Sequence, residues 1–411
     1  MLTIKNKIRS GFAILLASAI FISSCNKDPM EFPVPTPVPS TGATLGDTLK
    51  TNADDSLYYR LIVRAGMAGM LNSRTNSYTM FVPGNNAMKS FINAISGGAV
   101  PLSAPDAVFS GFITTNIPAT TAASIVGYNI IPQAVPAAAF GNTFPNMQYP
   151  TLLNPAPSVS DLLRLTTFPT NRNGNWVNNV PMTTVDWKAA NGYIHHTLAL
   201  VAPPQRYLWN RIDTDTDLTY LKAAIQRADS GTVAPGYLQG VLLNIGANLT
   251  VFAPNDNAFK TALTGAIAQA LIRAGVPPAT AMTQATSLAS TPAVFQNPAL
   301  FPVLTAELVK GLIVYHVLGN RAFVNNFPTT EESYPTLLNT AIPTHPGVKL
   351  QVTFGAPFPS AATVKGLENP TPSNIIINAS PLTPDPAGSS DQNYLNGVLH
   401  KIDQVLLPLP L

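Results

Sequence analysis

Two short stretches of the chain share one pattern of apolar and polar positions. Residues 78–83 (YTMFVP) and 249–254 (LTVFAP) are β-prone runs that alternate in polarity and end at a proline. Asparagine or aspartate follows each run, where a helix would need an N-cap. We therefore expect a strand, a tight turn and a helix at both places.

Further blocks recur in the same order along the chain. The matched pairs are YNII at 128–131 with YHVL at 315–318, YPTLLN at 149–154 and 334–339, and NGYIH at 191–195 with NGVLH at 396–400. Four matched blocks in one order indicate a duplicated domain. The spacing between matched blocks grows along the chain, so the second copy should carry extra loop sequence.

The patterns between these blocks predict further helices and strands. Helical spacing predicts helices at 57–65, 87–95, 107–113, 122–128, 218–228 and 308–317, and one or two extra helices within 265–302. Alternating or β-rich runs predict strands at 151–153, 162–166, 175–180, 182–188, 192–200, 349–354, 374–379 and 398–407. Asn173 and Gly174 predict a hairpin turn.

Together the matched blocks resemble the fasciclin domain, whose pattern joins a TVFAPTD-like segment, a later YHVL, and a closing NGVIH before an apolar strand that ends in proline. The second copy fits all three blocks, with TVFAPND at 250–256. The first copy has Gly84 and Asn85 in place of the usual Thr-Asp, and Asn129 in place of the histidine of the Tyr-His pair. The resemblance implies an α+β fold of two fasciclin-like domains at 45–204 (divergent) and 206–411, each a β-sheet wedge or sandwich packed with several short helices.

The resemblance also marks residues with a structural or adhesive role. In the second copy they are Phe252, Pro254, Asp256, Tyr315, His316, Asn396, Gly397 and His400. In the first copy they are Phe81, Pro83, Tyr128, Asn191, Gly192 and His195.

The N-terminus is typical of an exported bacterial lipoprotein. Basic residues precede an apolar run at 12–22 that is too short to span a bilayer, and ISSC at 22–25 resembles a lipobox. We expect a signal peptide at 1–24, lipidation of Cys25 and a proline-rich spacer at 25–44. Asn26 is not the aspartate that favours inner-membrane retention, so we expect an outer-membrane anchor facing the cell exterior.

Composition limits the classes of partner. Charged residues make up 10% of the chain and the net charge is +3 without a basic cluster, which argues against nucleic acid. Cys25 is the single cysteine, so a lipidated chain has no disulfide and no thiol chemistry.

The spacing of Asp213, Asp215 and Asp217 is that of a calcium loop, but Leu218 stands where such a loop needs glycine and Ala224 where it needs glutamate. Capping of the helix that starts near Leu218 is favoured, and calcium binding stays open. We expect no metal site and no cofactor.

The histidines are favoured as packed, hydrogen-bonded groups. Neighbours on a strand point to opposite faces, so His195 and His196 cannot easily chelate one metal. His316 and His400 should tie the helix that carries Tyr315 to the final strand. A hydrolase built around His195, His196 or Asp186 remains an alternative, although the common catalytic motifs are missing from the sequence.

Flat rings could recognise sugars or peptides, and Trp176, Trp187 and Trp209 are the candidates. A partly buried ring at a sheet edge is the favoured interpretation for each. The function that the resemblance implies is non-enzymatic: adhesion, or capture of an extracellular protein or polysaccharide at the cell surface. An accessory glycan-binding lipoprotein of an outer-membrane nutrient-uptake system is the alternative.

Overall fold

The computed structural model describes residues 41–231, 237–379 and 388–409. The predicted signal peptide, Cys25 and most of the proline-rich spacer lie outside these residues. No helix within the described ranges is long and apolar enough to cross a membrane.

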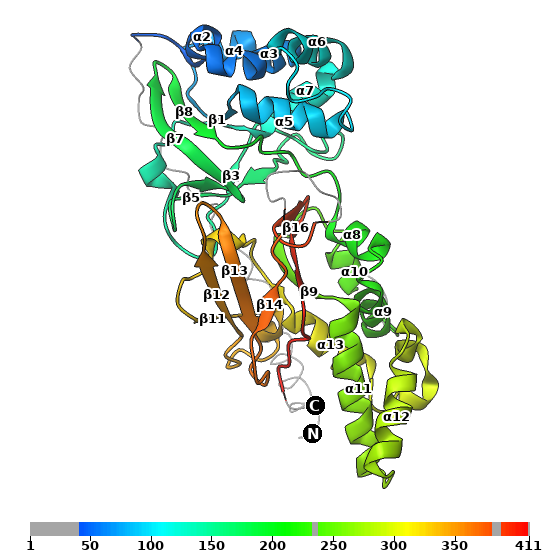
Figure 1. The fold of residues 1–411 in the computed structure, drawn as a ribbon. Coiled ribbons are helices and arrows are strands. Elements are labelled where there is room, and N and C mark those ends of the chain that lie inside the picture. The colour runs from blue at the N-terminus through cyan, green and yellow to red at the C-terminus, as the bar shows by residue number, and fades with distance from the viewer. Residues whose placement is uncertain (1–40, 232–236, 380–387, 410–411) are drawn as a thin grey trace, which may run out of the picture. The chain divides into compact units, whose positions relative to one another are not determined.

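The first half of the described chain is a helical layer followed by a sheet (Figure 1). Its helices are α2 (Leu45–Thr51), α3 (Ser56–Arg64), α4 (Ala68–Asn72), α5 (Asn85–Ile95), α6 (Asp106–Asn116) and α7 (Ala119–Tyr128). Its sheet has the order β2-β1-β8-β7-β6-β5. The strands are β1 (Tyr78–Pro83), β2 (Ile130–Ile131), β5 (Pro169–Thr170), β6 (Trp176–Val177), β7 (Val180–Ala189) and β8 (Gly192–Thr197), and β3 (Tyr149–Pro150) pairs with β4 (Thr166–Thr167) apart from them.

The second half repeats this plan with longer elements. Its helices are α8 (Leu208–Thr214), α9 (Thr219–Ala228), α10 (Leu238–Val241), α11 (Asp256–Arg273), α12 (Pro278–Leu288) and α13 (Ala306–Tyr315). Its sheet has the order β10-β9-β16-β14-β13-β12-β11, with β15 also paired to β16. The strands are β9 (Leu249–Pro254), β10 (Val317–Leu318), β11 (Glu332–Tyr334), β12 (Val348–Phe354), β13 (Pro359–Lys365), β14 (Ser373–Ile375), β15 (Gln392–Tyr394) and β16 (Gly397–Ile402).

A parallel strand pair lies at the centre of each half. The pairs are β1 with β8 and β9 with β16, and every residue of β1, β9 and β16 is buried. Side chains of β9 alternate between two cores, because Val251 and Ala253 pack with the helices whereas Phe252 packs with the remaining strands. Burial on both faces explains why these strands are mostly apolar, and their buried polar side chains, such as Thr79, Thr250 and His400, hydrogen bond within the protein.

The predicted strand, turn and helix are confirmed in both copies as β1–α5 and β9–α11. Asn255 is the N-cap of α11 and accepts a hydrogen bond from the N–H of Ala258 at 2.8 Å, whereas Gly84 begins α5 without a side-chain cap. Asn173 and Gly174 have positive φ angles in the loop between β5 and β6, as a hairpin turn requires.

Several predicted strands are wrong. Residues 151–153 and most of 162–166 have no strand structure, and 374–379 is shortened to β14. The two segments hydrogen bond to each other outside any strand: the N–H of Thr151 donates to the carbonyl of Leu165, and that of Leu165 to Leu153. Strand β13 was not predicted. The helix expected to be buried at 308–317 has Leu308 49% exposed and buries only one face.

Candidate functional site

The Asn-Gly pair at the start of the last strand has one role in both halves. The side chain of Asn396 accepts from the N–H of Leu208 at 3.0 Å and donates to the carbonyl of Leu242 at 2.8 Å. Asn191 makes the equivalent bonds, accepting from Leu45 at 2.7 Å and donating to Leu71 at 2.9 Å. Each asparagine therefore joins the first helix of its domain to the segment that precedes the central strand.

The glycine of each pair permits close approach of the parallel strands. A Cβ at Gly397 would lie 2.6 Å from the carbonyl oxygen of Leu249, and one at Gly192 would overlap that of Tyr78. Any larger residue would therefore separate the central pair.

The family-motif phenylalanine and histidine are neighbours across this pair. Phe81 lies opposite His195 and Phe252 lies opposite His400, with ring centroids 6.0 and 5.9 Å apart. All four side chains are fully buried.

Both of these histidines hold a loop through their two ring nitrogens. In His400, Nδ1 accepts from the N–H of Asp391 at 3.1 Å and Nε2 contacts the carbonyl of Ala322 at 2.9 Å. His195 contacts Asp186 and Val135 in the same way, each at 3.1 Å. The N–H donors fix Nδ1 as an acceptor, so the proton of each neutral ring lies on Nε2.

The aspartates of these loops also have matching contacts. Asp186 Oδ1 accepts from the N–H of Ala137 at 2.7 Å, and Asp391 Oδ1 accepts from Val324 at 2.8 Å. Both residues have positive φ angles, 61° and 54°. The sequence placed Asp186 only in a hypothetical hydrolase and gave no sign of Asp391. A pattern of aspartate nine residues before the strand histidine would have found both.

His316 connects the end of α13 to Leu406, just after β16, whereas the hydrogen bonds of His400, which was also expected to hold this helix, go to Asp391 and Ala322 instead. In His316, Nδ1 donates to the carbonyl of Leu312 at 2.8 Å and Nε2 accepts from the N–H of Leu406 at 2.8 Å. Burial lowers the pKa of His316 to about 4, and it lowers the pKa of His400 likewise to about 4. The pKa of His195 is also lowered by burial. These rings are neutral groups whose nitrogens are occupied within the protein.

Tyr315 and Tyr128 bind different segments. The hydroxyl of Tyr315 donates to Gly347 at 2.7 Å and accepts from the N–H of Leu367 at 2.9 Å. The hydroxyl of Tyr128 donates to Thr166 at 3.2 Å and accepts from the amide of Asn393, in the second half of the chain, at 3.2 Å.

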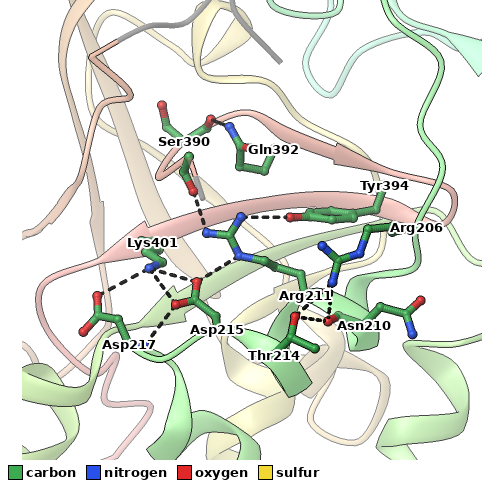
Figure 2. A network of polar contacts seen from close by, with 11 residues as sticks. Arg206, Asn210, Arg211, Thr214, Asp215, Asp217, Ser390, Gln392, Tyr394 and Lys401 are labelled. Carbon is green, nitrogen blue, oxygen red and sulfur yellow. Dashed lines mark hydrogen bonds and ion pairs between the residues drawn. The ribbon is translucent and has the colours of Figure 1, made fainter. Parts of the chain in front are cut away.

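The three aspartates of the calcium-like segment are paired with cations, and Figure 2 shows the contacts of Asp215 and Asp217. Asp215 Oδ2 lies 2.9 Å from both Arg211 Nε and Lys401 Nζ, and Asp217 lies 3.4 Å from Lys401. Asp213 contacts Lys222 at 2.8 Å. The described residues contain no group of three or more acidic, histidine or cysteine side chains arranged to hold a metal. Burial would raise the pKa of Asp215, but the N–H of Asp217 and the charges of Lys401 and Arg211 outweigh it and hold this pKa below its usual value.

The expected capping role of these aspartates is wrong. Helix α9 is capped by Asp256, which accepts from the hydroxyl of Thr219 at 2.6 Å and from the N–H of Tyr220 at 3.1 Å. Asn85 has the same task in the first half, where it accepts from the N–H of Leu57 at 3.0 Å. Asn85 stands where the second domain has Asp256, and it therefore keeps the same capping contact although it is not an aspartate.

His196 points away from His195, as strand geometry predicts. Its Nε2 lies 3.1 Å from Asp55 Oδ1, whose side chain is fully buried. Lys401 follows His400 as His196 follows His195, and it bonds to Asp215 and Asp217 before α9. In both halves the last strand thus holds the N-terminal helices through a side chain that bonds to an aspartate.

The described residues of 38–411 form one compact unit, and aromatic side chains join its two halves. Trp176 is 3% exposed, and its ring centroid lies 6.1 Å from that of Phe358. Phe168 lies 5.9 Å from Phe323. Trp209 is also buried but lies on helix α8, and Trp176 lies in β6 between two other strands, so the expected partly buried ring at a sheet edge is wrong for both. Trp187, in β7, is 42% exposed.

Arg321 was not predicted, because a lone arginine in a loop carries no pattern. Its guanidinium is buried, donates to Asn393 Oδ1 at 2.7 Å and lies 4.9 Å from the ring of Phe168. Burial lowers the pKa of Arg321 to about 10.

The repeated architecture and contacts define a protein of two related α+β domains, each organised by a central parallel strand pair. The model of the fasciclin domain matches residues 54–197 and 232–408, so the chain belongs to the fasciclin domain family.

The solved structures that match include the FAS1 domain pair from the insect cell adhesion molecule Fasciclin I. It is 13% identical over 85% of this chain and 95% of that chain, with a TM-score of 0.32. Because the TM-score is low, the assignment rests on the family model. No curated protein matches the chain in sequence.

Proposed function

We propose that this protein is a cell-surface lipoprotein that uses its tandem fasciclin domains for adhesion or for capture of an extracellular protein or polysaccharide. The observation that carries the proposal is the pair of fasciclin domains, a family generally related to cell adhesion. The lipobox that ends at Cys25 and the proline-rich spacer support a surface position.

The hydrogen bonds of the family-motif histidines favour a structural rather than a catalytic role for these side chains. His195, His316 and His400 each use both ring nitrogens to hold backbone groups. A general base needs a free nitrogen near its substrate. Ligand recognition is therefore assigned to surface loops carried by the rigid core.

The ligand class can be tested with the full-length chain on an array of extracellular-matrix proteins and polysaccharides. Retention of one class in the presence of excess unrelated protein is expected. An array on which the folded chain binds nothing would overturn the adhesive function.

The anchor can be tested with Cys25→Ser. The variant should lose the lipid and appear in a soluble fraction or as an unprocessed precursor, with Ser24→Ala as the matched control. Recovery of processed Cys25→Ser in the outer membrane at the normal level would contradict lipid anchoring.

The alternative role is that of a glycan-binding accessory of an outer-membrane importer, for which the exposed ring of Trp187 is a candidate contact. A neighbouring gene for such an importer, and slower growth on one polysaccharide after deletion of this protein, would favour it over adhesion.

A further inference from the structure

Two cavities adjoin where side chains of the two domains meet, and one carboxylate belongs to the walls of both. The smaller cavity, of about 230 Å³, includes Trp176, Phe358 and Asp391 in its wall. The larger cavity, of about 540 Å³, is lined by Asp391 together with many apolar side chains, among them Ile95 and Leu200. Asp391 therefore lies at the boundary between the two spaces.

The two oxygens of the Asp391 carboxylate differ in their contacts. Oδ1 accepts a hydrogen bond from the N–H of Val324 at 2.8 Å, whereas Oδ2 has no hydrogen-bond or ion-pair partner among the described residues. Only 11% of this side chain is exposed. Buried carboxylates are rarely left without a partner, because the loss of hydration is unfavourable. Oδ2 thus lacks a partner that a ligand could supply.

The first domain shows which part of this arrangement the fold requires. Asp186 has the same position in its loop, and its Oδ1 accepts from the N–H of Ala137 at 2.7 Å, but its side chain is exposed to solvent. The loop therefore needs only Oδ1. The enclosure of the second oxygen is particular to Asp391, which the neighbouring domain covers.

No cation of the protein neutralises this carboxylate from the wall of the smaller cavity, where none of the lining residues is a lysine, arginine or histidine. His400 is the titratable group beside it, with Nδ1 3.9 Å from Asp391 Oδ1. Burial lowers the pKa of His400 to about 4, so this ring is uncharged at neutral pH. An anion would be repelled from the cavity, whereas a cation would be attracted.

The charged and titratable groups on the adjoining elements are directed elsewhere. Arg206 lines the larger cavity, but its guanidinium donates to the carbonyl of Asn210 on α8. Arg321 donates to Asn393 Oδ1 and to the carbonyl of Tyr394. Burial raises the pKa of Tyr394, whose hydroxyl is therefore uncharged. The positive charge that this carboxylate lacks has to come from outside the chain.

The walls restrict the chemistry of that cation. The described residues hold no group of three or more acidic, histidine or cysteine side chains that could bind a metal ion. An ammonium group suits the wall better, because its N–H groups donate to a carboxylate and aromatic rings attract its charge. The rings of Trp176 and Phe358, 6.1 Å apart, are such rings. The apolar side chains of the larger cavity favour an apolar body.

We propose that the junction binds a small primary amine, with its ammonium group at Asp391 Oδ2 beside Trp176 and Phe358 and its apolar body in the larger cavity. The proposal is independent of the adhesive function above, because adhesion through outer loops does not need an enclosed site.

The test uses the full-length chain with n-hexylamine as the probe. Saturation-transfer NMR detects binding, and calorimetry at pH 8 gives the affinity and the stoichiometry. We expect one site per chain. 1-Hexanol has the same apolar body without the charge, and it should bind at least tenfold more weakly.

The pH dependence of binding reports on the carboxylate. Burial raises the pKa of Asp391 to about 7, so a proton competes with the ammonium group below that pH. The affinity for hexylamine should therefore fall about tenfold from pH 8 to pH 6. An alkylammonium keeps its charge over this range, as lysine does.

Asp391→Asn removes the charge and keeps an oxygen that can accept from Val324. It should bind hexylamine at least tenfold more weakly and without the pH dependence. Asp186→Asn, the same change at the exposed aspartate of the first domain, is the matched control and should leave the affinity unchanged. Phe358→Leu decides the question if Asp391→Asn does not fold. Phe358 is half-buried on the turn between β12 and β13, so this change should weaken binding without unfolding the protein.

No binding of hexylamine to the folded wild type at pH 8 would overturn the proposal. Equal affinities for hexylamine and 1-hexanol would overturn it too, because the site would then recognise only the apolar body. The same holds for an affinity that Asp391→Asn leaves unchanged, or one that is equal at pH 8 and pH 6. Hexylamine binding by a chain that retains nothing on the matrix array would support this site while contradicting the adhesive function.

Discussion

His316 Nε2 accepts a hydrogen bond from the backbone N–H of Leu406 at 2.8 Å, and the first domain makes the corresponding connection with opposite polarity. There Asn129 donates from Nδ2 to the carbonyl oxygens of Ile125 and Val201, both at 2.9 Å. Both residues reach the carbonyl four positions earlier in their helix. The segment after β8 presents an acceptor, the carbonyl of Val201, and the amide of Asn129 donates to it. The segment after β16 presents a donor instead, the N–H of Leu406, and the imidazole of His316 accepts from it.

This geometry predicts that acid weakens the second domain through His316. Its pKa of about 4 in the folded state lies below the unfolded value of roughly 6.5, so its contribution is present above pH 6.5 and is lost as the pH falls toward 4. Between pH 7.5 and pH 5 the loss is about 2 kcal/mol. In His316→Asn, urea unfolding should show a pH dependence smaller by this amount.

The matched control is His345→Asn, at a half-buried histidine of the same domain. Burial raises the pKa of Asp391 to about 7, so this carboxyl stabilises the fold as the pH falls and opposes the histidines. The comparison must therefore be made between variants rather than between domains. A His316→Asn variant with the full wild-type pH dependence would contradict the buried neutral role.

Phe252→Ala should lower the free energy of unfolding by about 3–5 kcal/mol, because it leaves a cavity against His400 and Phe327. Phe81→Ala should act similarly beside Phe140. Leu308→Ala, at a side chain 49% exposed, is the control and should change little. Thermal unfolding measures all three, and wild-type stability of both phenylalanine variants would contradict the central role of the strand pair.

Asn396→Ala should be destabilising by about 2–4 kcal/mol, because it leaves the N–H of Leu208 and the carbonyl of Leu242 buried without partners. Asn191→Ala should have a similar effect in the first domain. Asn257→Ala, on the exposed surface of α11, serves as control. Denaturant midpoints equal for Asn396→Ala and Asn257→Ala would show that this link between helix and strand is dispensable.

Calcium should not change the melting temperature, since the carboxylates of the 213–217 segment are paired with Arg211, Lys222 and Lys401. Asp215→Asn should cost about 3–5 kcal/mol because it removes the carboxylate that the buried Arg211 and Lys401 share. Asp213→Asn breaks an exposed pair and should cost at most about 1 kcal/mol. Calorimetry with and without calcium tests this; a calcium-dependent rise that Asp213→Asn abolishes would contradict it.

The sequence predicted those parts of the fold that local patterns determine. The strand, turn and helix at 78–95 and at 249–273 follow from polarity, proline and capping residues, and the duplication follows from matched letters. The parallel pairing of β1 with β8 was not predicted, because nothing local specifies which distant strands meet.

Prediction failed where long-range contacts decide the structure. Residues 151–153 look like a strand, yet their hydrogen bonds are made with Leu165, Gly127 and Ile130. The sequence suggested that Asp256 caps the helix that follows it. Its side chain instead caps α9, where it accepts from the N–H of Tyr220, 36 residues earlier. Trp176 and Asn325 line one cavity although they lie far apart in the sequence. Only tertiary packing brings them together, so local patterns could not predict this cavity.

The central parallel pair also has a consequence for the order in which the protein is made. Strand β9 has β16 as its parallel neighbour, and β16 is the last strand of the domain, as β8 is in the first. A contact order this high means that neither domain can complete its core until nearly all of its residues have left the ribosome. The first domain can fold while the second is still being made, and a chain that ends before Gly397 should retain one folded domain followed by a protease-sensitive tail.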